Sequence, residues 1–175
     1  ALKEMSELAN SCTAETGNVR TLWKQASAAM SRCGAAIRDE EQIREYCKVV
    51  QTQLKNFHTI VRVSNRGELA MAYRLRDMLL SQQAYLTAMV DYRAHGGKSR
   101  GSALYTDRKN GTKPFAHLPD TFTFALDKNE QPLIQELRYE NGICKTDWRE
   151  PRSIPEDDDF FENVWRSYRE TGNIQ

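Results

Sequence analysis

Apolar residues recur every three or four positions from residue 19 to about residue 92, which is the spacing of one face of an amphipathic helix. The first run extends from 19 to 37 and contains Val19, Leu22, Trp23, Ala26, Ala29, Met30, Cys33 and Ile37. A shorter helical pattern with Leu2, Met5 and Leu8 in phase precedes it, and Thr-Gly-Asn at 16–18 separates the two. We expect a long helix from residue 19, with Trp23 buried between helices.

Two further helices follow, each joined to its predecessor by a short link. Asp39 is placed to cap the second helix, with Gln42 three residues later in the manner of a capping box. Its apolar positions are Ile43, Cys47, Val50, Leu54, Phe57 and Val61. The third helix extends from about 68 to 92, and Gly96 and Gly97 mark its end. The pattern predicts a mainly α fold in which residues 1–110 form an antiparallel, spectrin-repeat-like three-helix bundle.

The hydrophobic period changes after residue 110. Alternation in 121–127 predicts a strand, 133–139 predicts a second, and Asn141-Gly142 predicts a hairpin turn leading into 143–148. A short C-terminal helix follows the acidic run 156–159, and its apolar face is supplied by Phe160, Phe161, Val164, Trp165 and Tyr168. Residues 111–175 are therefore expected to form a small antiparallel β-meander plus a terminal helix, packed as one unit with the bundle.

Composition excludes several classes of protein. The 25 lysines and arginines nearly balance the 24 aspartates and glutamates, which argues against a nucleic-acid binder. No apolar run reaches the roughly 18 residues of a membrane span. Cys12, Cys33, Cys47 and Cys144 lack metal-ligand spacing, and three of them lie on apolar stripes. Buried free thiols in the cytoplasm are the favoured interpretation, and disulfide pairing is the alternative. The chain begins in a helical pattern without methionine, which suggests a piece of a longer protein or a processed short one.

Gly97-Lys98-Ser99 resembles the end of a phosphate-binding loop, but the spacing fails. A Walker A loop needs a glycine five positions before Gly97, where this chain has Tyr92, and it should follow a strand rather than a helix. The three histidines, His58, His95 and His117, have no second ligand at helical spacing, so no metal site is expected. We expect no self-contained active site and leave open whether the intact protein is an enzyme.

The stretch 75–107 contains a long helical pattern followed by Lys98, Ser99, Arg100, Gly101 and, further on, Asp107. It resembles the C-terminal helical domain of the fumarate reductase/succinate dehydrogenase flavoprotein family, which includes L-aspartate oxidase and the adenylylsulfate reductase flavoprotein. Members carry a long helix that ends in a Glu-Ser-Arg-Gly-type loop. Residues 23–50, with Gly34 and Arg38, and the tail from 122 are also similar. Lys98 stands where the family has glutamate, and Ala103 stands where it has histidine.

The resemblance implies an FAD-dependent oxidoreductase acting on a dicarboxylate-like or other small substrate. The family's FAD-binding and catalytic residues belong to upstream domains that nothing here matches, so this chain is expected to bind no FAD and to be inactive alone. The implied partners are the flavin domain of the same chain and an electron-transfer subunit, in the cytoplasm or peripheral to a membrane through partner subunits.

Lys98, Ser99, Arg100 and Asp107 are the candidate interface residues. Arg100 either contacts the neighbouring domain or caps a helix within this one, since both uses suit a guanidinium on a glycine-flanked loop. Two other functional hypotheses stay open. One is a free-standing helical protein-interaction module. The other is a small hydrolase or transferase that uses Lys98, Ser99 and Arg100, although no base for it is visible.

Overall fold

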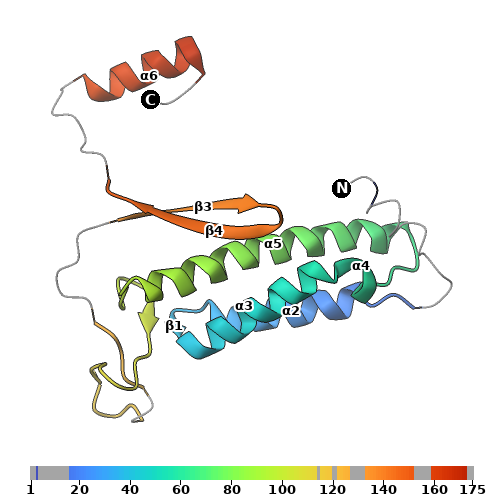
Figure 1. Cartoon of the computed structure of the whole chain (residues 1–175), viewed down its shortest axis with the longest axis horizontal. Coiled ribbons are helices and arrows are strands. Elements are labelled where there is room, and N and C mark those ends of the chain that lie inside the picture. The colour runs from blue at the N-terminus through green and yellow to red at the C-terminus, as the bar shows by residue number, and fades with distance from the viewer. Residues whose placement is uncertain are drawn as a thin grey trace.

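A computed structural model of the chain describes residues 3, 16–113, 115–119, 122–126, 133–151 and 159–172. Helices α2 (Val19–Cys33), α3 (Glu40–Lys55) and α5 (Arg66–Ala94) pack side by side, and consecutive members run in opposite directions (Figure 1). The short helix α4 (Phe57–Ile60) follows α3. The predicted mainly helical class is confirmed. Of the helical pattern expected at residues 2–8, only Lys3 is described, and it is helical.

Side chains define where the helices begin. The Asp39 carboxylate accepts a hydrogen bond from the backbone N–H of Gln42 at 3.0 Å, which confirms the predicted cap of α3. The Asn65 side chain accepts from Glu68 N–H at 2.9 Å and caps α5 in the same way. Both caps satisfy backbone donors that have no partner within their helix.

The second helix ends earlier than the apolar pattern predicts, at Lys55 rather than near residue 61. Asn18, which immediately precedes α2, holds the chain at the end of the short helix α4 that follows. Its side chain donates to the Ile60 carbonyl at 2.8 Å and accepts from the Arg62 N–H at 2.8 Å. The chain therefore leaves the helical path after α4 and is fastened to the start of α2.

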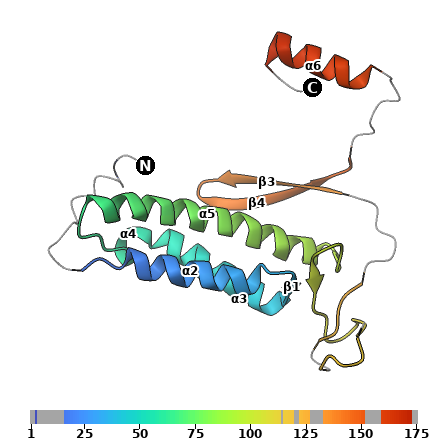
Figure 2. The same cartoon turned by 180° about the vertical axis from the view of Figure 1, so that it is seen from behind.

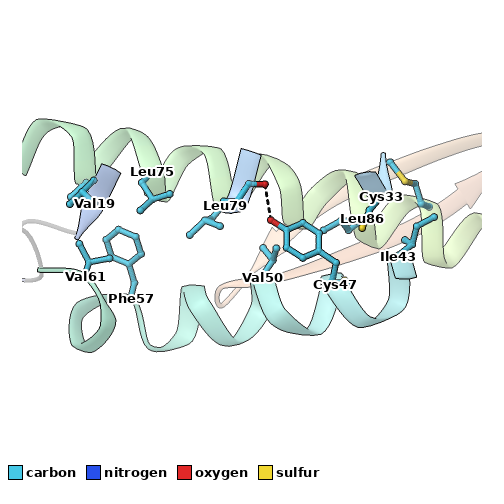
Figure 3. Close-up of a cluster of buried hydrophobic side chains, with 14 of the residues drawn as sticks. Val19, Cys33, Ile43, Cys47, Val50, Phe57, Val61, Leu75, Leu79 and Leu86 are labelled. Carbon is cyan, nitrogen blue, oxygen red and sulfur yellow. Dashed lines mark hydrogen bonds between the residues drawn. The ribbon is translucent and has the colours of Figure 1, made fainter. Parts of the chain in front are cut away.

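The core is a continuous row of apolar side chains between α2, α3, α4 and α5. Figure 3 shows it extending from Val19, Phe57 and Val61 at one end to Cys33 and Ile43 at the other. The expectation for Trp23 is met in part, because its side chain is partly buried and packs against this core. Ala26, on the same face of α2, occupies the fully buried position.

A two-stranded antiparallel hairpin, β3 (Ile134–Glu140) and β4 (Ile143–Arg149), lies along α5 on the side away from α2 and α3 (Figures 1 and 2). Asn141 and Gly142 both have positive φ, 53° and 79°, as a tight hairpin turn requires, so the predicted turn is confirmed. Gln135 donates to the Ala88 carbonyl at 3.0 Å and Tyr139 donates to the Leu80 carbonyl, which attaches the hairpin to α5.

The predicted three-stranded meander is wrong in one strand, because among its described residues only the two strands of the hairpin pair with each other. In the described part of 121–127, Phe124 and Leu126 form only isolated bridges, and their partners are Thr106, Thr112 and Ser99 rather than the hairpin. Phe124 is buried there because it packs into the loop that follows α5. Helix α6 (Phe160–Thr171) is present as predicted, and none of its residues is buried.

Candidate functional site

The loop after α5 folds back over the end of its own helix. Gly96 adopts φ 82° just after the helix ends, and Gly97 lies so close to the Tyr92 ring that an added Cβ would be 2.5 Å from it. The Tyr92 hydroxyl donates to the Lys98 carbonyl at 2.7 Å and accepts from the Lys98 N–H at 3.1 Å. The two glycines and Tyr92 therefore fix the direction that the backbone takes from the end of α5 to Lys98.

A short parallel pairing brings the α2–α3 link to this loop. Strand β1 (Ile37–Arg38) pairs with β2 (Leu104–Tyr105). Leu104 N–H donates to the Ala36 carbonyl at 2.7 Å, and Thr106 N–H donates to the Arg38 carbonyl at 2.9 Å. Arg38 and the loop after α5 therefore form one structural unit, although they are far apart in the sequence.

Tyr105 is the centre of this unit and is only 2% exposed. The guanidinium carbons of Arg38 and Arg93 each lie 5.5 Å from the centre of its ring, within the range of a cation–π contact. Arg38 also donates to the Tyr105 hydroxyl at 3.0 Å. The electron-rich face of the Tyr105 ring therefore offsets the repulsion between the two guanidinium groups.

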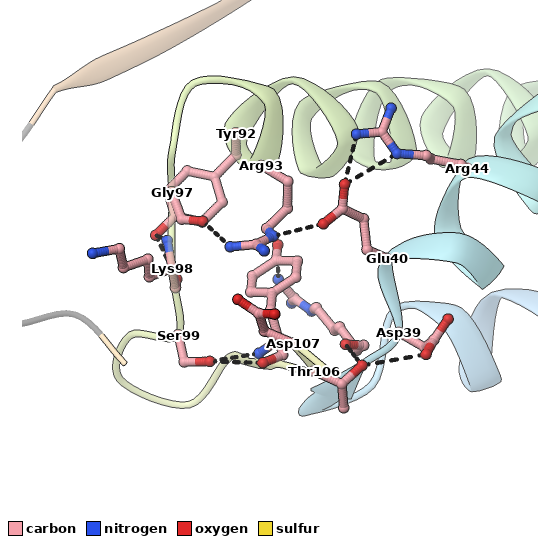
Figure 4. Close-up of polar contacts among 12 residues, drawn as sticks. Asp39, Glu40, Arg44, Tyr92, Arg93, Gly97, Lys98, Ser99, Thr106 and Asp107 are labelled. Carbon is pink, nitrogen blue, oxygen red and sulfur yellow. Dashed lines mark hydrogen bonds and ion pairs between the residues drawn. The ribbon is translucent and has the colours of Figure 1, made fainter. Parts of the chain in front are cut away.

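Arg93 is a structural cation. It donates to a Glu40 carboxylate oxygen at 3.0 Å and to the Gly97 carbonyl, as Figure 4 shows. Partial burial alone would raise the pKa of Glu40, but hydrogen bonds from Arg44 and Arg93 outweigh it and hold that pKa below its usual value. Glu40 therefore remains ionised and anchors Arg93, which leaves Arg93 little capacity for an external ligand.

Ser99 and Asp107, two of the four candidate interface residues, bond within the loop. Ser99 is only 4% exposed, and its hydroxyl donates to the Tyr105 carbonyl at 3.1 Å and accepts from the Tyr105 N–H at 2.7 Å. The Asp107 carboxylate accepts from the N–H groups of Lys109 and Asn110 at 3.0 and 2.9 Å. The Asn110 N–H foremost, with that of Lys109, holds the pKa of Asp107 below its usual value. These two residues stabilise the loop.

Lys98 and Arg100, the other two candidates, are exposed. Figure 4 shows the Lys98 amino group pointing away from the Arg93–Glu40 pair. Arg100 lies in a tight turn, in which its N–H and carbonyl bond to Ala103 at 2.8 and 3.0 Å. Its side chain has no hydrogen bond or ion pair with another residue in the described ranges, so it caps no helix there.

The exposed cations border a surface cleft of about 500 Å³. The residues that line it are Arg38, Tyr85, Ala88, Met89, Tyr92, Lys98, Arg100, Gly101, Ser102, Ala103, Tyr105 and Gln135. Neither a carboxylate nor a histidine is among these described lining residues, so Ser102 has no carboxylate or imidazole base beside it. The arrangement is suited to binding a negatively charged group rather than to nucleophilic catalysis.

The sequence pattern does not reveal most of this cleft. In the sequence, Arg38 stands out only as part of a Gly34–Arg38 junction, and Tyr105 does not stand out at all. A usable signal is present on α5, because Tyr85, Ala88 and Tyr92 recur at helical spacing along the edge of the buried stripe, next to buried Met89. That spacing places them on one face, next to the loop.

The remaining candidate chemistry lies away from the cleft. Cys33, Cys47 and Cys144 are buried free thiols as predicted, and burial raises the pKa of each. Protonated, buried thiols are poor nucleophiles. His58 and His117 are exposed, and the His95 ring lies 3.3 Å from an Asp91 oxygen at the end of α5.

The described residues offer neither a metal-binding cluster nor a helix that could span a membrane. They contain no group of three or more histidine, cysteine, aspartate or glutamate side chains that could hold a metal ion. Within the same ranges, no helix combines the length and the apolar character that crossing a membrane requires.

No protein-family model matches the chain, and no match to it was found among the curated proteins or the solved structures.

Proposed function

We propose that this chain is the C-terminal domain of an FAD-dependent oxidoreductase similar to the fumarate reductase/succinate dehydrogenase flavoproteins. Its role is to pack against the flavin domain of the same protein, and it is inactive alone. The observation that best supports this role is the environment of Arg100. Its guanidinium is exposed beside an acid-free cleft, and no described residue pairs with it. A rigid fork of donors suits a carboxylate or carbonyl group on a neighbouring domain.

The loop geometry supports a docking role in a second way. Tyr92, Ser99 and Tyr105 fasten the backbone on both sides of Lys98 and Arg100. The two cations are therefore displayed from a rigid support, which lowers the entropic cost of forming an interface. In the intact protein, FAD in the upstream domain would exchange hydride or electrons with a small substrate. An electron-transfer subunit and a cytoplasmic location belong to the same proposal.

The coding sequence upstream of Ala1 gives the first test. An open reading frame several times longer, with a dinucleotide-binding glycine motif near its start, supports the proposal. The isolated chain should be colourless after purification with FAD, because its only Gly-Lys-Ser sequence follows a helix. A stoichiometric yellow complex of the isolated chain would contradict the proposed division of labour.

Arg100→Ala gives the second test. In the isolated chain, the free energy of unfolding should change by less than about 1 kcal/mol, as at most exposed positions. In the full-length protein, the same change should accelerate FAD release by about tenfold, because the partner group loses its cation. Arg74→Ala, at an exposed position on α5 away from the cleft, is the matched control and should leave FAD release unchanged. Equal effects of the two substitutions on FAD release would exclude a docking role for Arg100.

A free-standing protein-interaction module is the second candidate, and α6 is the observation that favours it. Phe161 is 74% exposed and Trp165 is 59% exposed on a helix without a buried residue. Exposed aromatic side chains on one helix are typical of interaction surfaces. A native reading frame that begins close to Ala1 would favour this module over the flavoprotein domain.

A further inference from the structure

The cleft beside the loop has two chemically different halves. Its positive charge is provided by Arg38 of β1 and by Lys98 and Arg100 of the loop after α5. Its apolar lining is provided by Tyr85, Ala88 and Met89 of α5, and Gln135 of the hairpin also lines the cleft. The described lining includes no acid, so no lining residue pairs with these cations.

The cations differ in how far their donors are already used. Two N–H groups of Arg38 donate to the Ala35 carbonyl and the Tyr105 hydroxyl, both at 3.0 Å. These bonds hold the guanidinium in place, and its other N–H groups remain available. The side chains of Lys98 and Arg100 bond to no other described residue. The end of the cleft therefore combines one fixed guanidinium with two adaptable cations, a set suited to carboxylate groups.

The apolar half is also unfilled. Tyr85 is 64% exposed although it sits on the central helix, and buried Met89 lies beneath it on the same helix face. A large aromatic side chain exposed next to a concave surface favours burial of a second apolar group against it. The distribution of charge and apolar surface thus favours a ligand that is acidic at one end and apolar at the other.

We propose that this cleft binds an acidic segment of a polypeptide partner. Its carboxylates occupy the end formed by Arg38, Lys98 and Arg100, and an adjacent apolar side chain packs on Tyr85 and Met89. This inference deepens the proposed function and rests on it only for the identity of the partner, which would be the flavin domain. A polypeptide segment fits better than a small anion because the cleft opens widely to solvent and its two halves require two connected groups. A nucleic acid fits poorly, since the chain's net charge is only +1.

The test uses the whole 175-residue chain and two defined peptides. The first is acetyl-Gly-Phe-Glu-Glu-Gly-amide, and the second replaces both glutamates by glutamine. Backbone amide resonances of residues 98–103 are followed by ¹H–¹⁵N NMR during titration. We expect saturable shifts with the acidic peptide, with a dissociation constant in roughly the millimolar range, which suffices for a contact within one chain. The glutamine peptide should produce no saturable shift.

Variants locate the site. Arg100→Gln and Lys98→Gln should each weaken binding of the acidic peptide, Arg100→Gln by about tenfold, the loss expected for a charge-assisted hydrogen bond. Arg74→Gln removes an exposed arginine elsewhere on α5 and should leave the affinity unchanged. Tyr85→Ser tests the apolar half and should weaken the acidic peptide without affecting its dependence on salt.

Three results would overturn the proposal. They are equal shifts with the two peptides, equal losses of affinity in Arg74→Gln and Arg100→Gln, and saturation of the same amides by sodium acetate or phosphate at the peptide's concentration. The last result would indicate a small-anion site. None of them depends on the upstream reading frame, so failure of the acidic-segment proposal is distinguishable from failure of the flavoprotein proposal.

Discussion

The Tyr46 hydroxyl of α3 donates to the Gln82 side-chain oxygen of α5 at 2.8 Å, inside the helical core. The same hydroxyl hydrogen is shared with the Ala26 carbonyl of α2, which lies 3.0 Å from the Tyr46 oxygen and also accepts from the Gln82 amide nitrogen at 3.2 Å. One buried polar cluster therefore connects all three long helices. Because a shifted helix would leave these groups unsatisfied, the cluster specifies the register in which the helices pack.

Tyr46→Phe should lower the free energy of unfolding by about 1–3 kcal/mol. The substitution preserves the ring but leaves the Gln82 oxygen buried without its donor. Urea unfolding followed by circular dichroism measures the effect. Tyr85→Phe, which removes a hydroxyl from a tyrosine that is 64% exposed, is the control and should change stability by less than about 0.5 kcal/mol. Equal effects of the two substitutions would mean that the cluster does not contribute to stability.

The same hydroxyl should make the fold sensitive to alkali. Burial raises the pKa of Tyr46 to about 12, above the value of roughly 10 for an unfolded tyrosine. The folded state therefore holds this proton more tightly, and its stabilising contribution is complete below pH 10 and lost as the pH rises from about 10 to about 12. The free energy of unfolding, measured across this interval, should fall more steeply with pH for the wild type than for Tyr46→Phe. Parallel curves would contradict the assignment.

Asp91→Asn should loosen the hairpin from α5. The Asp91 carboxylate accepts from the Trp148 indole N–H at 2.6 Å and from the Gln135 amide at 3.1 Å. We expect a loss of about 1–3 kcal/mol, since hydrogen bonds to a charged acceptor are weakened. A shift of the Trp148 indole N–H resonance, with the core resonances of α2 and α3 unchanged, would identify the effect as local. Asp77→Asn, at an exposed position on α5, is the control.

Asp91 also predicts a dependence on acid. Burial alone would raise its pKa, but hydrogen bonds from Thr146, Trp148 and Gln135, with nearby His95, hold the pKa below its usual value. The stability it contributes is present above the unfolded pKa of roughly 4 and disappears as the pH falls through the lowered folded-state pKa. Asp91→Asn should lack this part of the acid dependence, and an unchanged acid limb would refute the role assigned to the carboxylate.

Ser99→Ala should disturb the loop rather than the bundle. The hydroxyl is buried and bonds to both backbone groups of Tyr105. Its loss should cost about 1–3 kcal/mol and shift the amide resonance of Tyr105, which loses its acceptor. Ser102→Ala, at an exposed position on the same loop, should leave both quantities unchanged. If Ser102→Ala has the larger effect, the loop is organised differently from the description above.

Features that depend on neighbouring residues could be predicted from the sequence, whereas features that depend on contacts between distant segments could not. The Asp39 cap and the Asn141-Gly142 turn depend on residues within three or four positions, so the sequence alone was sufficient. The path of the chain after α4 depends on Asn18, 44 positions before Arg62, and no periodicity reveals such a partner. The strand expected at 121–127 failed for the same reason, because its alternation was real but its partners lie in the loop.

The candidate interface residues divide in a way that the backbone explains. Lys98, Ser99 and Arg100 follow one another in an extended segment, where side chains alternate between faces. Ser99 therefore points inward to Tyr105, while Lys98 and Arg100 point to solvent. In the sequence the segment reads as one motif. The alternation separates Ser99, which stabilises the loop, from Lys98 and Arg100, which are the binding candidates.

The pairing of β1 with β2 joins positions 67 residues apart, so it affects the stage of folding at which the cleft forms. Helices form from local contacts, whereas closing so long a segment costs chain entropy and tends to come late in folding. The same pairing can then open without melting the bundle. The amides of Leu104 and Thr106 should exchange with deuterium faster than those at the middle of α5. A ligand held by both Arg38 and Arg100 would slow that exchange, so occupancy of the cleft and closure of this end of the molecule are thermodynamically linked.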